Sequence, residues 1–419
     1  MRTIHFLLLV MFFFITIPTL NAEESLTWEQ CVSETKQAHP DLNAALAILQ
    51  QVEATKRITE GLLLPQLSSS MSTIQNGTTG TGSNAALSYS LQVQQLLYDG
   101  HKTSNQVSSN REAIKATQYN YKIVSATVRS ALRSAFAQLL LFQDLVGLTV
   151  EIAERRQKNV RLINLYYQGG REHIGSLRQA EADLAQAQFE VSQAKRGLVL
   201  AQTTLASALG RDVHKPLRVQ GTFAVSDLST SKPDLALLAK NHPQFQQLDA
   251  LSKGARYDLE SAKSAFSPQL YLTSSLGRGA FDRLPVDAVD WSAGVTLSVP
   301  IYQGGSGRAA VDKAMAFVSQ QSAQEKSGFN QLINTLEQNW KNFQDARQSV
   351  VVQKKQLDAA VDRSTIANAE YSNGLLTFND WVIIENNLVS AEKSYLNAEA
   401  NLLIAEAQWI QSKGGELEG

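Results

Sequence analysis

Residue types that do chemistry are few in this 419-residue chain, and they are not arranged as a reactive site. No two of the six histidines have the spacing of a metal site. They are His5, His39, His101, His173, His214 and His242. Cys31 is the only cysteine, which excludes an internal disulfide and a multi-cysteine zinc or iron–sulfur site. The phosphate-binding G-x-x-x-x-G-K-[ST], the hydrolase G-x-S-x-G and the metalloprotease H-E-x-x-H are absent from the sequence. We therefore expect neither an enzyme nor a bound metal or cofactor.

The charge balance limits the class of partner. The chain has 38 Lys+Arg and 39 Asp+Glu, which leaves a net charge of −1. A nucleic-acid-binding protein needs an excess of basic residues to neutralise phosphates, so we expect no nucleic-acid partner.

The N-terminus predicts export from the cytoplasm. Arg2 precedes an apolar run from Phe6 to Ile17, and Leu20-Asn21-Ala22 offers a cleavage site. We interpret residues 1–22 as a signal peptide, because the run is short for a membrane anchor, which is the alternative. We expect no transmembrane helix after it.

An internal repeat organises the rest of the chain. Seven landmarks recur in order at an offset of 203 or 204 residues, which indicates a duplicated unit of about 200 residues. The pairs are His39-Pro40 and His242-Pro243, Pro65-Gln66-Leu67 and Pro268-Gln269-Leu270, Leu97-Tyr98-Asp99-Gly100 and Ile301-Tyr302-Gln303-Gly304, Phe136 and Trp340, Tyr167 and Tyr371, Gly170 and Gly374, and Gly210 and Gly414. We expect repeats at 23–210 and 234–414, a linker at 211–233 and a short tail at 415–419.

Each repeat predicts the same series of elements. A leading helix starts after Thr27, whose spacing from Gln30 is that of a capping box, and continues to about Leu64 with a break at Pro40. Two strands follow, because apolar and polar residues alternate over 87–94 and 291–301, with less regular partners at 66–75 and 269–278. Then come a long helix and a returning helix. These are expected at 103–167 and 174–209, and at 307–371 and 378–412.

The returning helices have a heptad pattern. In the first, large residues recur every seventh position from Leu177 to Leu205, and alanines from Ala180 to Ala208 occupy the partner position. This period of 3.5 predicts a left-handed coiled coil with closely approaching helices.

Length and strand number constrain the assembly. A helix of about 65 residues is roughly 100 Å long, and the returning helix covers only about half of that, so two shorter helices can lie end to end beside each long one. Strands that face lipid must close into a barrel, and outer-membrane barrels need at least eight strands. Four strands per chain are too few, whereas three chains would supply twelve.

The sequence resembles the TolC-like outer-membrane efflux proteins. The resemblance is carried by Leu26-Thr27, His39-Pro40-Asp41-Leu42, both Pro-Gln-Leu motifs, Leu297-Ser298-Val299-Pro300-Ile301-Tyr302-Gln303-Gly304-Gly305 and Tyr371-Ser372-Asn373-Gly374. It implies a homotrimer in the outer membrane of a Gram-negative bacterium. A twelve-stranded β-barrel in contact with outer-membrane lipid would be continued by a periplasmic α-helical barrel. It also implies partnership with an inner-membrane transporter and a periplasmic adaptor in an efflux or type I secretion system.

The resemblance also implies functional positions at the helix-hairpin tips. Asp380 and Tyr371 correspond to the periplasmic gate, and Gly170, Arg171, Gly374 and Leu375 to the tips that contact the adaptor. Several family features are missing. Ile383 stands at a second acidic position, Leu375-Leu376 replace an expected basic residue, and Ser176 occupies the acidic position of the first tip.

Plainer roles remain open for these residues. Asp380 can be an acid that stabilises the start of a helix, Tyr371 a packing residue, and both glycines helix C-caps. For the whole chain, the alternative to a passive exit duct is a structural or adhesive coiled-coil protein of the periplasm or cell surface.

Overall fold

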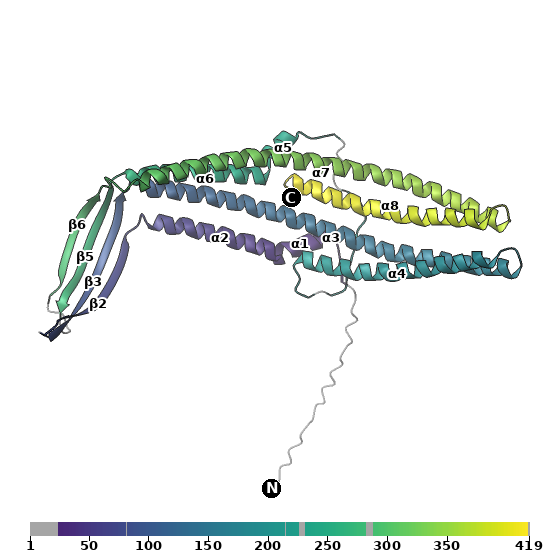
Figure 1. The fold of residues 1–419 in the computed structure, drawn as a ribbon, viewed down its shortest axis with the longest axis horizontal. Coiled ribbons are helices and arrows are strands. Elements are labelled where there is room, and N and C mark those ends of the chain that lie inside the picture. Colours follow the sequence, from purple (N-terminus) through teal and green to yellow (C-terminus); the bar gives the residue numbers. More distant parts are fainter. Residues whose placement is uncertain (1–23, 81, 214, 226–230, 282–287, 418–419) are drawn as a thin grey trace, which may run out of the picture.

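The chain is long and narrow, with a small sheet at one end and two helical hairpins at the other (Figure 1). The computed structural model describes residues 24–417 except 81, 214, 226–230 and 282–287. The predicted signal peptide, residues 1–22, lies outside the described residues. The mostly helical class with a small β part is confirmed.

The order of elements in the first half of the chain recurs in the second. The first half contains α1 (Trp28–Ala38), α2 (Pro40–Gly61), β2 (Gln66–Thr78), β3 (Gly82–Tyr98), α3 (Lys102–Gln168) and α4 (Ile174–Leu209). The second contains α5 (Leu235–Asn241), α6 (Pro243–Lys263), the 3-10 helix η1 (Ser264–Phe266), β5 (Gln269–Phe281), β6 (Asp290–Ser298), α7 (Ser306–Ser372) and α8 (Phe378–Ser412). In addition, β1 (Glu24–Leu26) pairs in parallel with β4 (Leu217–Val219), which lies between the two halves.

Most boundaries agree closely with the sequence, and two predictions are wrong. The leading helix ends at Gly61 instead of near Leu64, and residues 62–64 form a turn before Pro65. The last strand ends at Ser298 instead of Ile301, because Pro300 has no N–H with which to continue a strand ladder. The capping box is present: the Thr27 hydroxyl accepts from the Gln30 N–H, and the Gln30 side chain accepts from the Thr27 N–H.

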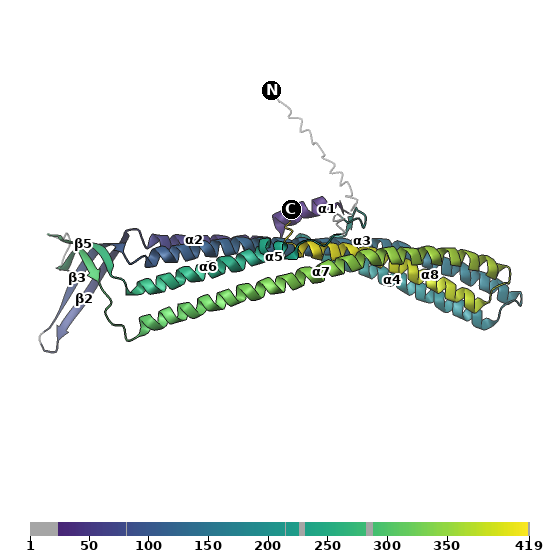
Figure 2. The same ribbon diagram turned by 90° about the horizontal axis from the view of Figure 1, so that it is seen from above.

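Two long helices set the length of the molecule. α3 and α7 have 67 residues each, which corresponds to about 100 Å. Figures 1 and 2 show α2 and α4 following one another along α3, while α6 and α8 follow one another along α7. This is the arrangement that the helix lengths predict.

The long strands form one antiparallel sheet in the order β2-β3-β5-β6, so β2 and β6 are its edges. One face is mainly apolar, with pairs such as Leu67 with Val93 and Leu272 with Val295, although Ser69 and Ser274 also lie on it. On the other face serine hydroxyls hydrogen-bond in pairs across the strands. The pairs are Ser70 with Ser90 at 2.8 Å, and Ser72 with Ser88 and Ser275 with Ser292 at 2.7 Å. The apolar face is open to the surroundings, since Trp291 is 77% exposed and Leu297 is 63% exposed.

Near the middle of the molecule, equivalent residues of the two halves form equivalent packing. Phe136 and Trp340 are buried in two separate core clusters. Gly210 directly follows α4 with a backbone φ of 82°. Gly414, in the turn after α8, has a φ of 81°. A Cβ on Gly210 would lie 2.9 Å from the backbone of His39, and one on Gly414 would lie 2.7 Å from Pro243. These glycines let the helix ends meet the His-Pro breaks of their own half.

The heptad seam of α4 faces α3. In the middle of the seam the alanines are more deeply buried than the large residues, whereas Leu177 and Leu205 near its ends are also buried and Ala208 is half-buried. Ala180, Ala187, Ala194 and Ala201 are buried, while Leu184, Val191 and Leu198 are only half-buried. In α8 the large residues Trp381, Leu388, Leu402 and Trp409 are buried as well.

One described helix, α3, contains an 18-residue stretch apolar enough to cross a membrane by length and composition, which the sequence analysis does not predict. Six residues between Leu132 and Leu140 of this helix lie in a buried core cluster, and 39% of the apolar stretch is buried within the described structure.

Candidate functional site at the hairpin tips

The two hairpin tips have the same backbone form. Gly170 follows α3 with a φ of 71°, and Gly374 follows α7 with a φ of 75°. The next N–H in each case bonds back into the helix, from Arg171 to the Tyr166 carbonyl at 2.8 Å and from Leu375 to the Glu370 carbonyl at 2.9 Å. Both glycines therefore act as left-handed C-caps, which is the plainer of their two expected roles.

Tyr371 lies in an aromatic cluster at the second tip. Its ring is stacked on Trp381 with a centroid distance of 4.6 Å and an interplanar angle of 8°. Tyr166 of the first hairpin and Phe378 complete the cluster, at 5.8 and 6.4 Å from Tyr371. The Trp381 indole donates to Asn368 Oδ1 at 2.7 Å, so its polar group is satisfied. Tyr371 therefore does pack between helices, and the packing also fixes the position of its hydroxyl.

That hydroxyl reaches a carboxylate of the other hairpin. Tyr371 donates to Glu172 Oε1 at 2.9 Å, and the Ser176 hydroxyl donates to Glu172 Oε2 at 2.8 Å. Burial and the hydrogen bond to Glu172 both raise the pKa of Tyr371, so the phenol stays protonated near neutral pH. Ser176 stands where the resemblance places an acid, but Glu172, four residues earlier, supplies a carboxylate. Glu172 lies in a turn, and no periodicity of the sequence indicates that it reaches across.

Arg171 provides a basic group at the same place. Its guanidinium lies over the Tyr166 ring, 4.4 Å from the centroid. Its Nη2 is 3.3 Å from the point that a Cβ on Gly374 would occupy. The sequence lacks a basic residue directly after Gly374, and in the structure Arg171 of the opposite tip lies against that glycine.

Asp380 is exposed in the first turn of α8. Its carboxylate accepts from the Thr377 hydroxyl at 2.7 Å, and its N–H donates to that hydroxyl at 3.2 Å. These contacts are those of an acid that stabilises a helix start. Ile383, at the expected second acidic position, is exposed one turn further on. A place for Asp380 beside a channel axis depends on an assembly and remains a proposal.

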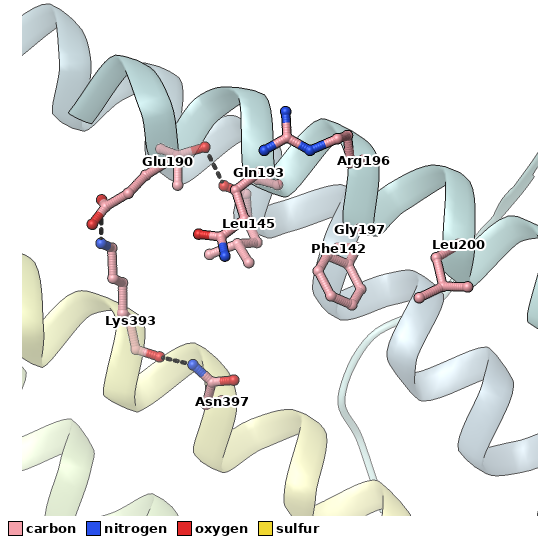
Figure 3. A pocket seen from close by; sticks show the side chains of 11 residues that line it. Phe142, Leu145, Glu190, Gln193, Arg196, Gly197, Leu200, Lys393 and Asn397 are labelled. Atoms are coloured by element: carbon pink, nitrogen blue, oxygen red, sulfur yellow. Dashed lines mark hydrogen bonds and ion pairs between the residues drawn. The ribbon is translucent and has the colours of Figure 1, made fainter. Parts of the chain in front are cut away.

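Above the tips, polar contacts connect the first hairpin to α8. Arg155 binds Glu392 with two hydrogen bonds, and Arg156 donates to Asn386 Oδ1. Further along, Lys393 pairs with Glu190 of α4 (Figure 3). Burial acts to raise the pKa of Glu190, but the bonds from Lys393 and Gln186 and the nearby charges outweigh it and lower that pKa.

The Lys393–Glu190 pair borders a cleft of about 590 Å³ between α3, α4 and α8. Figure 3 shows Phe142 of α3 beside Gly197 of α4 in this cleft. A Cβ on Gly197 would lie 2.2 Å from the Phe142 ring, so the two helices approach closely because the residue is glycine. Within the described residues no group of three or more histidines, cysteines or acids could hold a metal.

Comparison with known proteins identifies relatives for both halves of the chain. The model of the family described as "Outer membrane efflux protein" matches residues 31–211 and again residues 235–415. The outer membrane efflux protein BepC of Brucella suis is 22% identical over 393 residues, which cover 90% of this chain and 84% of BepC. The outer membrane protein TolC of Salmonella enteritidis is 23% identical over 390 residues, which cover 86% of this chain and 76% of TolC. The crystal structure of CusC, described as forming a transmembrane channel, has a TM-score of 0.84 at 18% identity and covers 92% of each chain.

Proposed function

The chain belongs to the outer membrane efflux protein family, and we propose that three copies form a channel that passively conducts substrates out of the cell. The protein lies in the outer membrane and extends into the periplasm. Its relatives are channel proteins, and we assign no catalytic step to it.

The observation that carries this proposal is the uncovered apolar face of the four-stranded sheet. Exposure of this apolar face to water would be unfavourable, whereas in a bilayer the lipid chains would cover it. The sheet also has two open edges, β2 and β6, which cannot remain unpaired in hydrocarbon. Three copies would join edge to edge into a closed barrel of twelve strands. The serine-rich face would then line a water-filled lumen.

The helices support the same assembly. In α7, buried residues begin only at Leu332, and Val351 and Val352 further along are exposed. A second copy beside α7 would cover such residues. The assembled helices would extend the barrel by about 100 Å into the periplasm.

The finer assignment is an exit duct of a tripartite efflux or type I secretion system, which also contains an inner-membrane transporter and a periplasmic adaptor. Energy would come from the transporter. The hairpin tips lie at the end of the molecule away from the sheet, where an adaptor would dock (Figure 1). Leu375 is 78% exposed there and can be buried by a partner. We assign the adaptor contact to Gly170, Arg171, Gly374 and Leu375, and the constriction to Tyr371 and Asp380.

A structural or adhesive coiled-coil protein is the alternative function, and it fits less well. Such a protein needs the helices but has no use for a sheet with one mainly apolar, exposed face. A channel uses both faces.

Fractionation, native mass measurement and planar-bilayer recording test the proposal. We expect the full-length protein to fractionate with outer membranes, to run as a trimer in mild detergent and to give discrete conductance steps. A monomer that forms no conducting unit would contradict the channel proposal and favour the coiled-coil alternative.

A further inference from the structure

We propose that each copy binds a phosphate-bearing lipid of the outer leaflet through Arg278, which lies on the mainly apolar face of the sheet near Tyr89 and Trp291. The inference rests on the proposed function, because it requires the sheet to stand in the outer membrane with this face toward lipid. It adds a binding site to that arrangement and names the chemistry of the ligand.

The sheet carries almost no charge. Within the bounds of β2, β3, β5 and β6, Arg278 is the one basic residue and Asp290 the one acidic residue. Arg278 lies opposite Tyr89, and Tyr89 lies opposite Met71, so by register these three residues share the mainly apolar face. A cation on a lipid-facing surface is unfavourable near the bilayer midplane and is tolerated near the interfaces. The level of Arg278 along its strand therefore decides what it can do.

Aromatic residues mark two levels along the strands. At the end next to the helices, Tyr98 ends β3 and Tyr302 follows β6, and these side chains are 48% and 86% exposed. Tyr89 lies nine residues before Tyr98 on the same strand. Nine residues of strand extend about 30 Å, which is roughly 23 Å across a bilayer at the usual tilt of a barrel strand. This agrees with the apolar band of about 25 Å that separates two aromatic girdles in outer-membrane barrels.

Arg278 lies at the level away from the helices. It is paired with Tyr89, and Trp291 lies opposite Leu276, two residues before Arg278 on β5. Leu272 and Leu276 precede the arginine on the same face, so Arg278 stands where the apolar run ends. Because the protein extends from the outer membrane into the periplasm, the helices are periplasmic and this level is on the side of the cell exterior (Figure 1).

An arginine at this level is suited to a lipid phosphate. Its five N–H donors match the paired oxygens of a phosphate, and its long side chain can reach the headgroups while its methylene groups stay beside apolar side chains. Arg278 also faces Asp290, but its Nη1 is 3.6 Å from Asp290 Oδ1, which is longer than a hydrogen bond. The Arg278 side chain is 35% exposed and that of Asp290 is 74% exposed. An ion pair of this kind is weak and leaves the guanidinium able to bind a second anion.

Asp290 provides a test with the opposite sign. Its carboxylate competes with a lipid phosphate for the guanidinium and repels the phosphate. Removal of this charge in Asp290→Asn should therefore strengthen lipid binding, whereas Arg278→Gln should weaken it. If the two residues served only to hold β5 and β6 together, neither change would alter lipid binding in this way.

Native mass measurement of the full-length trimer in mild detergent tests the site. The probe is lipid A with two phosphates, added in increasing amounts. We expect at least tenfold weaker binding to Arg278→Gln than to wild type, intermediate binding to Arg278→Lys, and at least threefold tighter binding to Asp290→Asn. Arg178→Gln is the matched control and should bind as wild type does, because Arg178 is exposed on α4 near the hairpin tips.

Two further arms identify the source of the phosphate. Lipid A without its phosphates should bind to wild type at least tenfold more weakly than the phosphorylated form, and millimolar inorganic phosphate should not displace the bound lipid. These arms and Asp290→Asn decide the question even where Arg278→Gln does not assemble.

Three results would overturn the lipid site. They are equal binding to wild type and Arg278→Gln, equal binding of the two forms of lipid A, and displacement by inorganic phosphate, which would make free phosphate the ligand. A trimer that gives any of these results and still conducts in planar bilayers would leave the channel proposal intact. A wild-type protein that forms no trimer would overturn both proposals.

Discussion

Tyr371 donates a 2.9 Å hydrogen bond to Glu172 Oε1, and this bond joins the tips of two hairpins that are 199 residues apart in the chain. Tyr371 is only 4% exposed, and Ser176 holds the second oxygen of Glu172. A hydrogen bond to a charged group contributes about 1.5–3 kcal/mol in proteins. The contact therefore stabilises one specific approach of the hairpins, the approach that would narrow the proposed channel.

Removal of the Tyr371 hydroxyl should loosen the tips. In Tyr371→Phe the ring can still stack on Trp381, but Glu172 loses its partner in the second hairpin. We expect higher single-channel conductance in planar bilayers. Tyr395→Phe is the matched control, because Tyr395 bonds to Glu399 on α8, outside the tip contact. Equal conductance in wild type and Tyr371→Phe would show that this hydrogen bond does not restrict the proposed channel.

Replacement of Asp380 should separate its two possible roles. Three carboxylates around a narrow aqueous axis would attract cations and repel anions. Asp380→Asn should therefore reduce cation selectivity, measured as the reversal potential under a salt gradient, and weaken block by a trivalent cation. As a helix-start acid alone, Asp380 would contribute only about 0.3–1 kcal/mol to stability. An unchanged reversal potential with a slightly lower melting temperature would leave Asp380 this second role only.

Much of the fold could be predicted because its signals are local or periodic. The hairpin helices begin and end within two residues of their predicted positions. Pro40 and Pro243 start helices, and Gly210 and Gly414 take the left-handed backbone that glycine favours. The alternation in β3 and β6 predicts a sheet with one apolar face. Each signal depends on a residue and its near neighbours.

The tip contacts were less predictable because they are tertiary. Glu172 and Arg171 lie in a turn, and their partners, Tyr371 and Gly374, come from a different hairpin. The resemblance to the family points to an acid at position 176 and a base directly after Gly374. It therefore names Arg171 only as a tip residue, without its contact at Gly374, and it does not indicate Glu172. The geometry of the turn, and not the spacing of residue types, brings them together.

Overpacking of the α3–α4 seam should destabilise the first hairpin. Ala187 is buried against α3. Ala187→Leu adds three carbons there and should cost about 1–3 kcal/mol of unfolding free energy. Ala187→Ser is the control, since it adds a single oxygen that can bond within the helix. Ala391 of α8 is only half-buried, so Ala391→Leu should cost less. Denaturant unfolding checks the order, and an Ala187→Leu protein as stable as wild type would contradict the seam assignment.

Acidification should destabilise the region around His242. This histidine is 8% exposed, and its Nδ1 caps α6 by accepting the Gln244 N–H at 3.1 Å. Burial lowers its pKa below the ordinary value of 6.5, so the folded state binds fewer protons than the unfolded state at mildly acidic pH. The stabilisation is complete above pH 6.5 and is lost as the pH falls toward the folded-state pKa, at no more than about 1.4 kcal/mol per pH unit.

Asn can cap the helix without titrating, so His242→Asn should flatten this part of the stability profile. His39→Asn makes the same replacement at the equivalent cap of α2 and should retain the slope due to His242. Unfolding measured by circular dichroism between pH 5 and 8 tests this. Identical slopes in wild type and His242→Asn would assign the acid sensitivity to other groups.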